Sequence, residues 1–328
     1  MRQVKYQDAL REATREEMLR DPNVLVIGQD IGVFEGNFKV TAGLLKEFGP
    51  KRIVDTPLCE LGPTGMAVGA AIAGLRPIME VAYMDFICMC MDPIVNQAAK
   101  ARYMFGGKVK VPVVFRFGFG PGKQRAAQHS QNFEAWLTHV PGLKVAIPSD
   151  SYDAKGLLKT AIRDDSPVAF IEHKMLYGVA SEMPDEDVEY TIPFGQAKVK
   201  REGTDVTIVA ISKMVGESLK AAEILEQEGI SAEVIDPRTL VPLDEEALRT
   251  SARKTGRVII AHDAVKRGGI GGELAAVISE DEETFRSLKA PIRRVFALDL
   301  PLPFNAGLEK MVLPDAEKIA QAARELMK

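Results

Sequence analysis

The sequence is poor in the residues that build disulfides and metal clusters. Its 328 residues include only three cysteines, Cys59, Cys88 and Cys90, and four histidines. So few thiols are typical of a reducing compartment, where structural disulfides do not form. Cys88 and Cys90 are separated by one residue and lack the second ligand pair that a structural zinc site requires. We therefore expect buried, unpaired thiols and no zinc.

Positive charge and long apolar runs are also scarce. The net charge is -4, with a pI near 5.8, so no basic surplus exists to neutralise phosphates and we expect no nucleic-acid partner. No apolar run approaches the ~20 residues of a membrane span, and we expect no membrane partner. The charged, amphipathic N-terminus does not resemble a targeting peptide. We therefore expect a cytoplasmic protein of prokaryotic type.

The chain does contain two successive series of alternating strand and helix patterns. Predicted strands at 24–28, 77–81, 111–117, 144–147 and 168–171 alternate with helical stretches, and a second series has strands at 206–211, 232–235, 258–262 and 295–298. Such alternation is typical of α/β domains with mostly parallel sheets. We predict an α/β domain over 1–178, an acidic, proline-containing linker over 179–204 and a second α/β domain over 205–328.

The stretch DTPLCELGPTGMAVGAAIAG, residues 55–74, carries the clearest chemical signal. Glu60 precedes a predicted helix of glycine, alanine and small aliphatic residues, which can pack against another backbone at close range. A carboxylate beside such a buried surface is costly without a partner. An ordinary carboxylate that complements the helix dipole is the alternative. The residues alone leave both interpretations open.

Two glycine-rich loops carry weaker signals. GGIGGE at 268–273 lacks the spacing of a dinucleotide-binding turn, and GFGPG at 118–122 lacks the lysine of a P-loop. Both are interpreted as turns in which glycine supplies unusual backbone angles.

Several long strings together resemble one family. They are FGPKRIVDTPLCELGPTGMAVGAAIAGLRPIMEVAYMDF, DPIVNQAAKARYMFGG, QHSQNFEAWLTHVPGLKVAIPSD, VIDPRTLVPLD and LPLPFNAGLE, in this order. In these strings the chain resembles, over nearly its full length, the β subunits of the E1 component of thiamine-diphosphate-dependent 2-oxo acid dehydrogenases. That family includes pyruvate, branched-chain and acetoin enzymes. The resemblance implies an N-terminal pyrimidine-binding domain and a C-terminal transketolase-like domain.

The resemblance also implies roles for three side chains. Glu60 would hydrogen-bond the aminopyrimidine N1′ of thiamine diphosphate and so activate the cofactor. Phe86 would pack against the aminopyrimidine, although ordinary core packing remains an alternative. His129, in the QHSQ motif, would orient the substrate carboxylate or protonate the dihydrolipoyl sulfur. His139 and His173 are expected to be structural, and the role of His262 stays open.

The resemblance further implies a monovalent cation, usually potassium, bound mainly by backbone carbonyls. The matching positions are Val113, Ala161, Ile162, Asp164 and Ser166. Relatives often carry asparagine at the position of Ser166, a change that a carbonyl ligand would survive. The sequence does not identify the cation.

One motif of this cofactor class is missing. The chain has no G-D-G sequence followed by asparagine to hold Mg²⁺ and the diphosphate. We therefore expect half of a site, with Mg²⁺ held mainly by an α subunit in an α2β2 heterotetramer, and an E2 lipoyl acyltransferase as a further partner.

The expected activity follows from this resemblance. It is oxidative decarboxylation of a 2-oxo acid, pyruvate favoured, with transfer of the acyl group to a lipoyl disulfide, which makes the enzyme an oxidoreductase acting on an oxo group. Acetoin cleavage and branched-chain substrates remain open. Two rival classes are a self-sufficient transketolase-like enzyme and a non-catalytic scaffold. The sequence does not decide the substrate or the type of E2 core.

Overall fold

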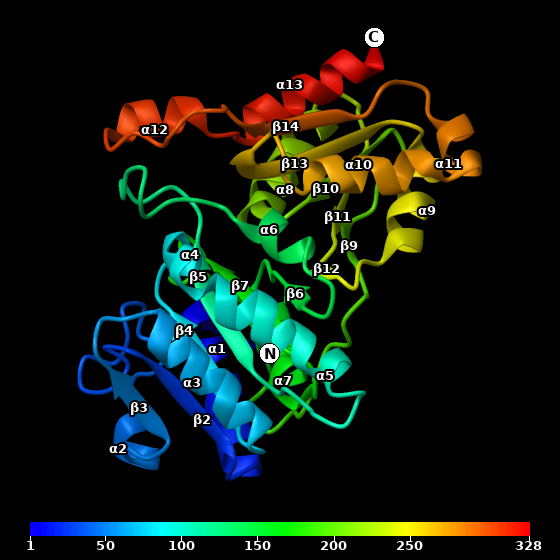
Figure 1. The fold of residues 1–328 in the computed structure, drawn as a ribbon. Coiled ribbons are helices and arrows are strands. Elements are labelled where there is room, and N and C mark those ends of the chain that lie inside the picture. Colours follow the sequence, from blue (N-terminus) through cyan, green and yellow to red (C-terminus); the bar gives the residue numbers. More distant parts are fainter. The chain divides into compact units, whose positions relative to one another are not determined.

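The computed structural model describes residues 1–328, and the chain divides into two compact units (Figure 1). The first unit comprises Met1–Phe119 and Trp136–Phe194. The second comprises Gly120–Ala135 and Gly195–Lys328. The segment Gly120–Ala135 thus leaves the first stretch of the chain and groups with the second unit.

The first unit is built on a parallel sheet in the strand order β6-β7-β5-β4-β2-β3. Its strands are β2 (Val24–Gln29), β3 (Ile53–Thr56), β4 (Arg76–Val81), β5 (Val114–Phe119), β6 (Lys144–Ala146) and β7 (Val168–His173). Every residue of β5 and β7 is buried, as expected of central parallel strands covered on both faces. A separate antiparallel pair joins β1 (Arg2–Lys5) to β8 (Ala180–Met183).

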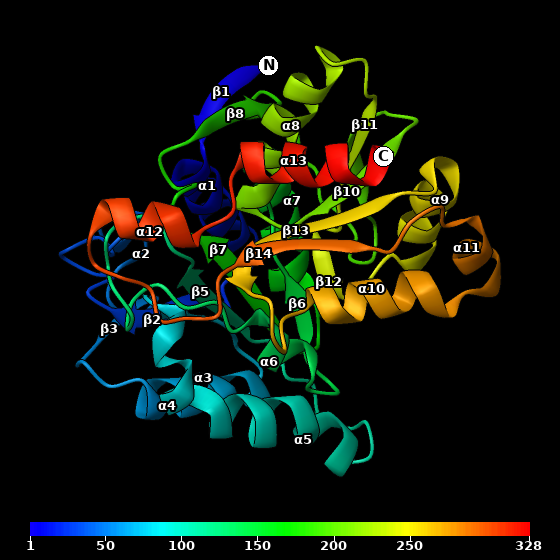
Figure 2. The ribbon, with the colours of Figure 1, turned by 90° about the horizontal axis from the view of Figure 1, so that it is seen from above.

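Helices cover both faces of this sheet. On one face α1 (Tyr6–Arg20) packs along α7 (Ser151–Arg163). The other face carries α3 (Leu61–Ile72), the π-helical η2 (Asp92–Ala98) and α5 (Ala99–Met104) (Figures 1 and 2). Shorter elements are α2 (Leu44–Phe48), η1 (Met84–Phe86) and α4 (Ile87–Met91). The short helix α6 (Glu134–Thr138) begins in the segment Gly120–Ala135 of the second unit and ends in the first unit.

The second unit has a five-stranded sheet in the order β14-β13-β10-β11-β9. The parallel strands are β10 (Val206–Ala210), β11 (Ala232–Asp236), β13 (Val258–Val265) and β14 (Arg293–Ala297), and β9 (Lys198–Arg201) runs antiparallel at the edge. One core joins α8 (Lys213–Glu226) and α13 (Ala316–Met327) to the sheet. The remaining elements are β12 (Thr239–Val241), α9 (Glu245–Thr255), α10 (Gly271–Glu280), α11 (Glu282–Ser287) and α12 (Ala306–Val312).

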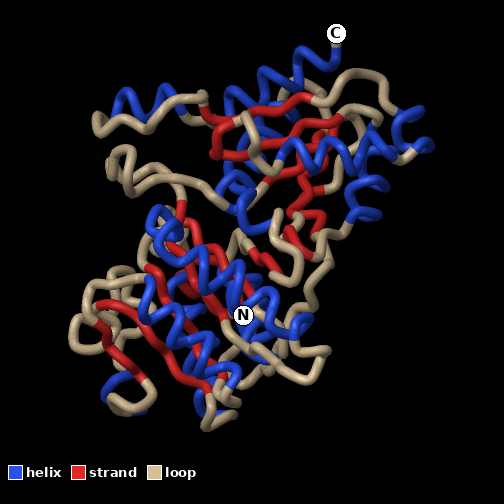
Figure 3. The backbone as a smooth tube through the Cα atoms, in the orientation of Figure 1, coloured by secondary structure: helices blue, strands red, loops and turns tan.

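The α/β class predicted from the alternation is confirmed (Figure 3), and every predicted strand has a counterpart among the observed strands. The strands missed by the sequence interpretation are β1, β3, β8, β9 and β12, each of three or four residues. So short a strand shows too few alternations to be recognised. No helix is long and apolar enough to cross a membrane.

Candidate functional site

Glu60 lies at the start of α3, where the chain turns out of β3. It is the N-cap residue, and its carbonyl oxygen accepts hydrogen bonds from the backbone nitrogen of Thr64 at 3.2 Å and from Oγ1 of Thr64 at 2.7 Å. The side chain is half-buried and makes no hydrogen bond or ion pair within the chain. The backbone therefore fixes a carboxylate whose oxygens remain available to a group from outside the chain.

The small residues of α3 divide between two faces. Ala67, Val68 and Ala71 are buried against the unit, whereas Gly65 and Gly69 are exposed. A Cβ atom at either glycine would meet nothing within 4 Å. Packing within this chain therefore does not require these glycines, and they leave a face on which another backbone can approach closely.

Phe86 ends η1, just after β4, and its ring is half-buried. The ring meets Tyr83 edge to face, with centroids 6.3 Å apart. Tyr83 in turn contacts Phe38, which stacks on Tyr177 at 4.4 Å. Phe86 thus belongs to a row of aromatic rings and is only partly buried.

A polar bridge connects the beginnings of α3 and α4. Oγ1 of Thr64 lies 3.3 Å from Sγ of Cys90, which lies 3.7 Å from the carbonyl oxygen of Phe86. Because Thr64 also reaches the carbonyl of Glu60, the structure brings Glu60 and Phe86 into one neighbourhood. Burial raises the pKa of the Cys90 thiol to about 11, so this group stays protonated and can donate.

The expectation of buried thiols holds for one cysteine only. Cys90 is buried, but Cys59 and Cys88 are exposed, and all three are unpaired. Cys59 and Cys88 belong to the surface around α3 and α4, so the expectation that they are buried is wrong.

A buried ion network lies where β4, β5 and β7 run side by side. Arg116 donates to both carboxylate oxygens of Glu172 at 2.6 Å and to Glu80 at 2.7 Å, and Tyr177 donates to Glu172 at 2.8 Å. Burial raises the pKa of Glu80 even though Arg116 opposes that shift. Burial lowers the pKa of Arg116. The carboxylates of Glu172 and Glu80 outweigh that effect and hold the pKa above its ordinary value, so the guanidinium stays charged.

Sequence reasoning missed this network. The signal that could have found it is one ionisable residue inside each of three apolar strands: Glu80 in PIMEV, Arg116 in VFRFGF and Glu172 in VAFIEH. Buried charges are rare unless they are paired, and neighbouring parallel strands are where such partners would lie.

The five positions expected to bind a monovalent cation lie around the C-terminal end of α7. They are Val113, Ala161, Ile162, Asp164 and Ser166. The carbonyl oxygen of Val113 accepts from the backbone nitrogen of Val168 at 2.9 Å, which connects the segment before β5 to the segment after α7. Carbonyl oxygens at a helix C-terminus carry partial negative charge, which favours a cation.

Two positive side chains already reach this cluster. Arg76 donates to the carbonyl oxygens of Ile162 at 2.9 Å and Asp164 at 3.0 Å. Lys144 pairs with the carboxylate of Asp164, which also accepts from the backbone nitrogen of Ser166 at 2.8 Å. The carboxylate is therefore engaged within the chain. The residues fit a cation held by the second lone pairs of carbonyl oxygens, in competition with Arg76.

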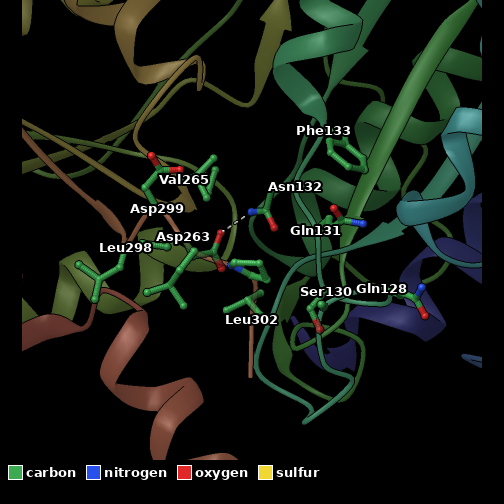
Figure 4. A pocket seen from close by; sticks show the side chains of 15 residues that line it. Gln128, Ser130, Gln131, Asn132, Phe133, Asp263, Val265, Leu298, Asp299 and Leu302 are labelled. Atoms are coloured by element: carbon green, nitrogen blue, oxygen red, sulfur yellow. Dashed lines mark hydrogen bonds between the residues drawn. The ribbon is translucent and has the colours of Figure 1, made fainter. Parts of the chain in front are cut away.

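His129 lies in the segment that groups with the second unit. It is half-buried, and Asn132, three residues later, donates to Asp263 of β13 at 2.9 Å. Figure 4 shows the side chains of Asn132 and Asp263 turned toward one another in a pocket of about 500 Å³. Residues 127–128, 130–133, 263–265 and 297–302 supply its lining, so the neighbours of His129 line the pocket and His129 itself does not. Glu60 and Phe86 thus belong to the first unit and His129 to the second.

The other histidines differ from one another. His173 is buried, and its Nδ1 accepts from the backbone nitrogen of Met175 at 3.1 Å, as a structural residue should. His139 is exposed, so it is not the buried structural residue that the apolar sequence around it suggested. His262 is fully buried between Glu134 and Asp263.

Comparison with known domains defines the class of protein. Residues 2–179 match the model of the transketolase pyrimidine binding domain, and residues 195–319 match that of the transketolase C-terminal domain. A solved structure described as a split gene transketolase, in an inactive beta4 tetramer, superposes with a TM-score of 0.81 at 25% identity. That comparison covers 99% of this chain and 98% of the other. The chain is a two-domain protein of the transketolase type.

Relatives with assigned names narrow this class. The β subunit of the pyruvate dehydrogenase E1 component from Rickettsia felis is 47% identical, covering 99% of this chain and 98% of its own length. The β subunit of the acetoin:2,6-dichlorophenolindophenol oxidoreductase of Bacillus subtilis is 45% identical, with coverage of 99% and 98%. A mitochondrial pyruvate dehydrogenase E1 β subunit of Oryza sativa subsp. japonica is 46% identical, covering 98% and 86%. The chain belongs to the family of E1 component β subunits, as the sequence resemblance predicted.

Proposed function

We propose that this chain supplies the pyrimidine-binding half of a thiamine-diphosphate site that is completed by an α subunit. The observation that carries the proposal is the carboxylate of Glu60, fixed at the start of α3 without a partner in its own chain. The part of this carboxylate that is out of contact with water has lost hydrogen bonds to solvent that no group of the chain replaces. A hydrogen-bond donor on a bound aminopyrimidine would offset that loss.

Three features of the first unit fit such a ring. The carboxylate of Glu60 can accept a hydrogen bond from a protonated ring nitrogen, and Phe86 offers a partly exposed aromatic ring. Thr64 and Cys90 fix the backbone from which both side chains project. The bound cofactor supplies the carbanion chemistry that breaks the bond next to a carbonyl, and the protein supplies orientation and electrostatics.

The proposed reaction is decarboxylation of a 2-oxo acid, with pyruvate favoured, and transfer of the acyl group to a lipoyl disulfide of an E2 acyltransferase. Its support is the family membership, with pyruvate dehydrogenase subunits among the relatives. In this reaction His129 binds the substrate carboxylate or donates a proton to the lipoyl sulfur. A half-buried histidine on a loop is suited to either task because its ring nitrogens can donate or accept a hydrogen bond.

The α subunit is proposed to carry the Mg²⁺ and diphosphate half of the site. Two observations support this division. The chain has no G-D-G sequence followed by asparagine, and its relatives include subunits that are themselves named β. The exposed face of α3, with Gly65 and Gly69, is the proposed contact with a partner chain. Potassium is proposed at the carbonyl cluster after α7.

Acetoin is the second candidate substrate. The Bacillus subtilis relative, named for acetoin oxidation, covers the same 99% of this chain as the Rickettsia felis relative does. A thiamine-type site can cleave either molecule because both carry a carbonyl next to the bond that breaks. The α subunit must therefore contribute to the choice.

Calorimetric titration of thiamine diphosphate with Mg²⁺ tests the shared site. The chain would be titrated alone and after mixing with an α subunit encoded in the same genome. Binding only in the mixture is expected, and turnover of pyruvate, branched 2-oxo acids and acetoin would then be compared. Tight binding by the chain alone would contradict the shared site and favour a self-sufficient enzyme.

A further inference from the structure

A buried cluster in the second unit has no part in the proposed reaction. His262 of β13 is fully buried, with Nε2 at 3.0 Å from Oε1 of Glu134 and Nδ1 at 3.1 Å from Oδ1 of Asp263. The same Oδ1 accepts from the side-chain nitrogen of Asn132 at 2.9 Å. Two residues of β13 thus contact Asn132 and Glu134, Asp263 through a hydrogen bond and His262 through ion-pair proximity. Asn132 and Glu134 stand two positions apart at the end of the loop that carries His129.

The protonation state of His262 decides how this cluster is joined. Nδ1 lies 3.1 Å from Asp263 but also 3.2 Å from the backbone nitrogen of Ala264. Nδ1 can donate to the carboxylate only when protonated, and it can accept from the backbone only when it is not. The imidazolium therefore presents a proton to each carboxylate, at Nδ1 to Asp263 and at Nε2 to Glu134, whereas the neutral ring has one proton and can serve only one of them.

The neighbouring charges favour the imidazolium. Burial lowers the pKa of His262, but the carboxylates of Glu134 and Asp263 outweigh burial and raise it to about 9. Glu134 comes from α6 and Asp263 from the histidine's own strand, whereas β14 contributes the uncharged ring of Phe296 at 5.9 Å. Glu134 is fully buried and pairs with no other group, so a neutral His262 would leave its charge uncompensated.

The other end of the same loop is also fastened. Glu309 of α12, which is buried, accepts from the backbone nitrogens of Gly122 at 2.9 Å and Gln124 at 3.2 Å. Gln124 and Ala126 have positive φ angles of 53° and 56°, conformations that most residues adopt only when their surroundings enforce them. The QHSQ sequence at 128–131 lies between these two attachment points.

We infer that His262 is a positioning residue that bridges Glu134 and Asp263, ties the end of the His129 loop to β13 and so fixes where His129 stands. The attachment of the loop follows from the contacts of the second unit alone. Its consequence for catalysis rests on the proposed role of His129.

Hydrogen exchange measured by mass spectrometry on the full chain tests the attachment directly. The variants are His262→Gln and Glu134→Gln, with His139→Gln as the matched control because His139 is exposed. Both cluster variants should raise exchange of peptides within 120–135 by about 10-fold while other β-strands stay protected. The double variant, which removes both charges, serves if either single variant does not fold.

Selective ¹³C labelling of histidine gives a second, spectroscopic readout, since the chain has only four histidines. One imidazole should remain protonated until about pH 9 in the wild type. In Glu134→Gln the same resonance should titrate at lower pH, because one of the two carboxylates that raise its pKa has been neutralised. Protection of the 120–135 peptides, taken relative to the intrinsic base-catalysed exchange rate at each pH, should fall in parallel with that titration.

Kinetics with the reconstituted α subunit complete the test. His262→Gln should lower kcat roughly 10- to 100-fold, since a misplacement near 1 Å can cost that much, without changing the Kd of thiamine diphosphate. Exchange at 120–135 equal to that of the wild type in a folded His262→Gln chain would overturn the inference. Increased exchange with unchanged kcat would leave the attachment standing and would instead remove His129 from the proposed mechanism.

Discussion

At the scale of single residues, the molecule has acidic side chains in two contrasting environments. Glu60 lies outside any ion pair, whereas Glu80 and Glu172 are buried and paired with Arg116 as a triad. Glu60 is half-buried and has no partner within the chain. The triad is fully paired inside the sheet. An available carboxylate on the surface suits ligand binding, whereas a satisfied buried network fixes strands relative to one another.

Replacing Glu60 by glutamine should affect catalysis and leave folding intact. The amide keeps the shape of the side chain but is uncharged, so it accepts a hydrogen bond from a protonated ring nitrogen less strongly than the carboxylate does. We expect kcat in the reconstituted enzyme to fall by about 10²-fold or more, with the melting temperature of the chain changed by no more than about 2 °C, because no intrachain bond is lost. Glu282→Gln, at an exposed helical pair, is the control. Undiminished activity of Glu60→Gln would exclude the proposed role.

The triad allows a second prediction, based on the asymmetry of its charges. Arg116→Met leaves two buried carboxylates without a cation, which should cost about 3–5 kcal/mol of unfolding free energy. Glu80→Gln keeps an acceptor for Arg116 and removes repulsion from Glu172, so we expect a change within about 1 kcal/mol. Chemical denaturation measures both. A larger loss from Glu80→Gln than from Arg116→Met would contradict this account.

At the scale of elements, α3 shows how one helix serves two surfaces. Its alanine and valine side chains pack inward, whereas Gly65 and Gly69 face outward, where a Cβ atom would meet nothing within 4 Å. Glycine in a helix is less favourable than alanine by about 1 kcal/mol. Retaining glycine on an outward face therefore makes physical sense if another backbone approaches there.

Substitution of these glycines separates folding from assembly. Gly65→Ala and Gly69→Ala should each leave the isolated chain as stable or more stable by up to about 1 kcal/mol, while weakening association with the α subunit. Gly216→Ala in α8 is the matched control, since Gly216 is likewise helical, exposed and unobstructed. Thermal melting of the chain and sedimentation of the mixture measure the two effects. Normal assembly of both α3 variants would remove this face from the proposed interface.

The C-terminal end of α7 carries the prediction for potassium. Its carbonyl oxygens already accept from Arg76, so a cation must add to those bonds. We expect the melting temperature of the full chain to be higher in potassium chloride than in sodium or choline chloride at equal ionic strength, because a ligand bound only by the native state stabilises it. Identical melting in all three salts would count against the site.

At the scale of the whole molecule, stability should depend on pH through His262. Its folded-state pKa, about 9, is above the ordinary value near 6.5. The stabilisation is therefore fully present below about pH 6.5, declines as pH rises and is gone above about 9, amounting to roughly 3 kcal/mol at most. Denaturation of wild type and His262→Gln across this range measures it. The difference between the two proteins should shrink as pH rises, and a growing difference would contradict the assigned charge.

Much of this protein follows from local sequence. Short apolar runs that alternate with helical stretches along the chain predicted the central strands of both units. This worked because parallel strands covered on both faces consist of nearly continuous apolar residues. The family resemblance singled out Glu60, Phe86 and His129, whose roles stay predictions.

Tertiary structure alone decided the rest. Sequence reasoning did not anticipate the pairing of Arg116 with two carboxylates, the exposure of Cys59 and Cys88, or the outward face of the glycines in α3. Nor did it show that the loop carrying His129 groups with the second unit and is held there by His262. Each depends on which surfaces meet in space, and residues as far apart as Asn132 and Asp263 become neighbours only when packing of the whole unit brings them together.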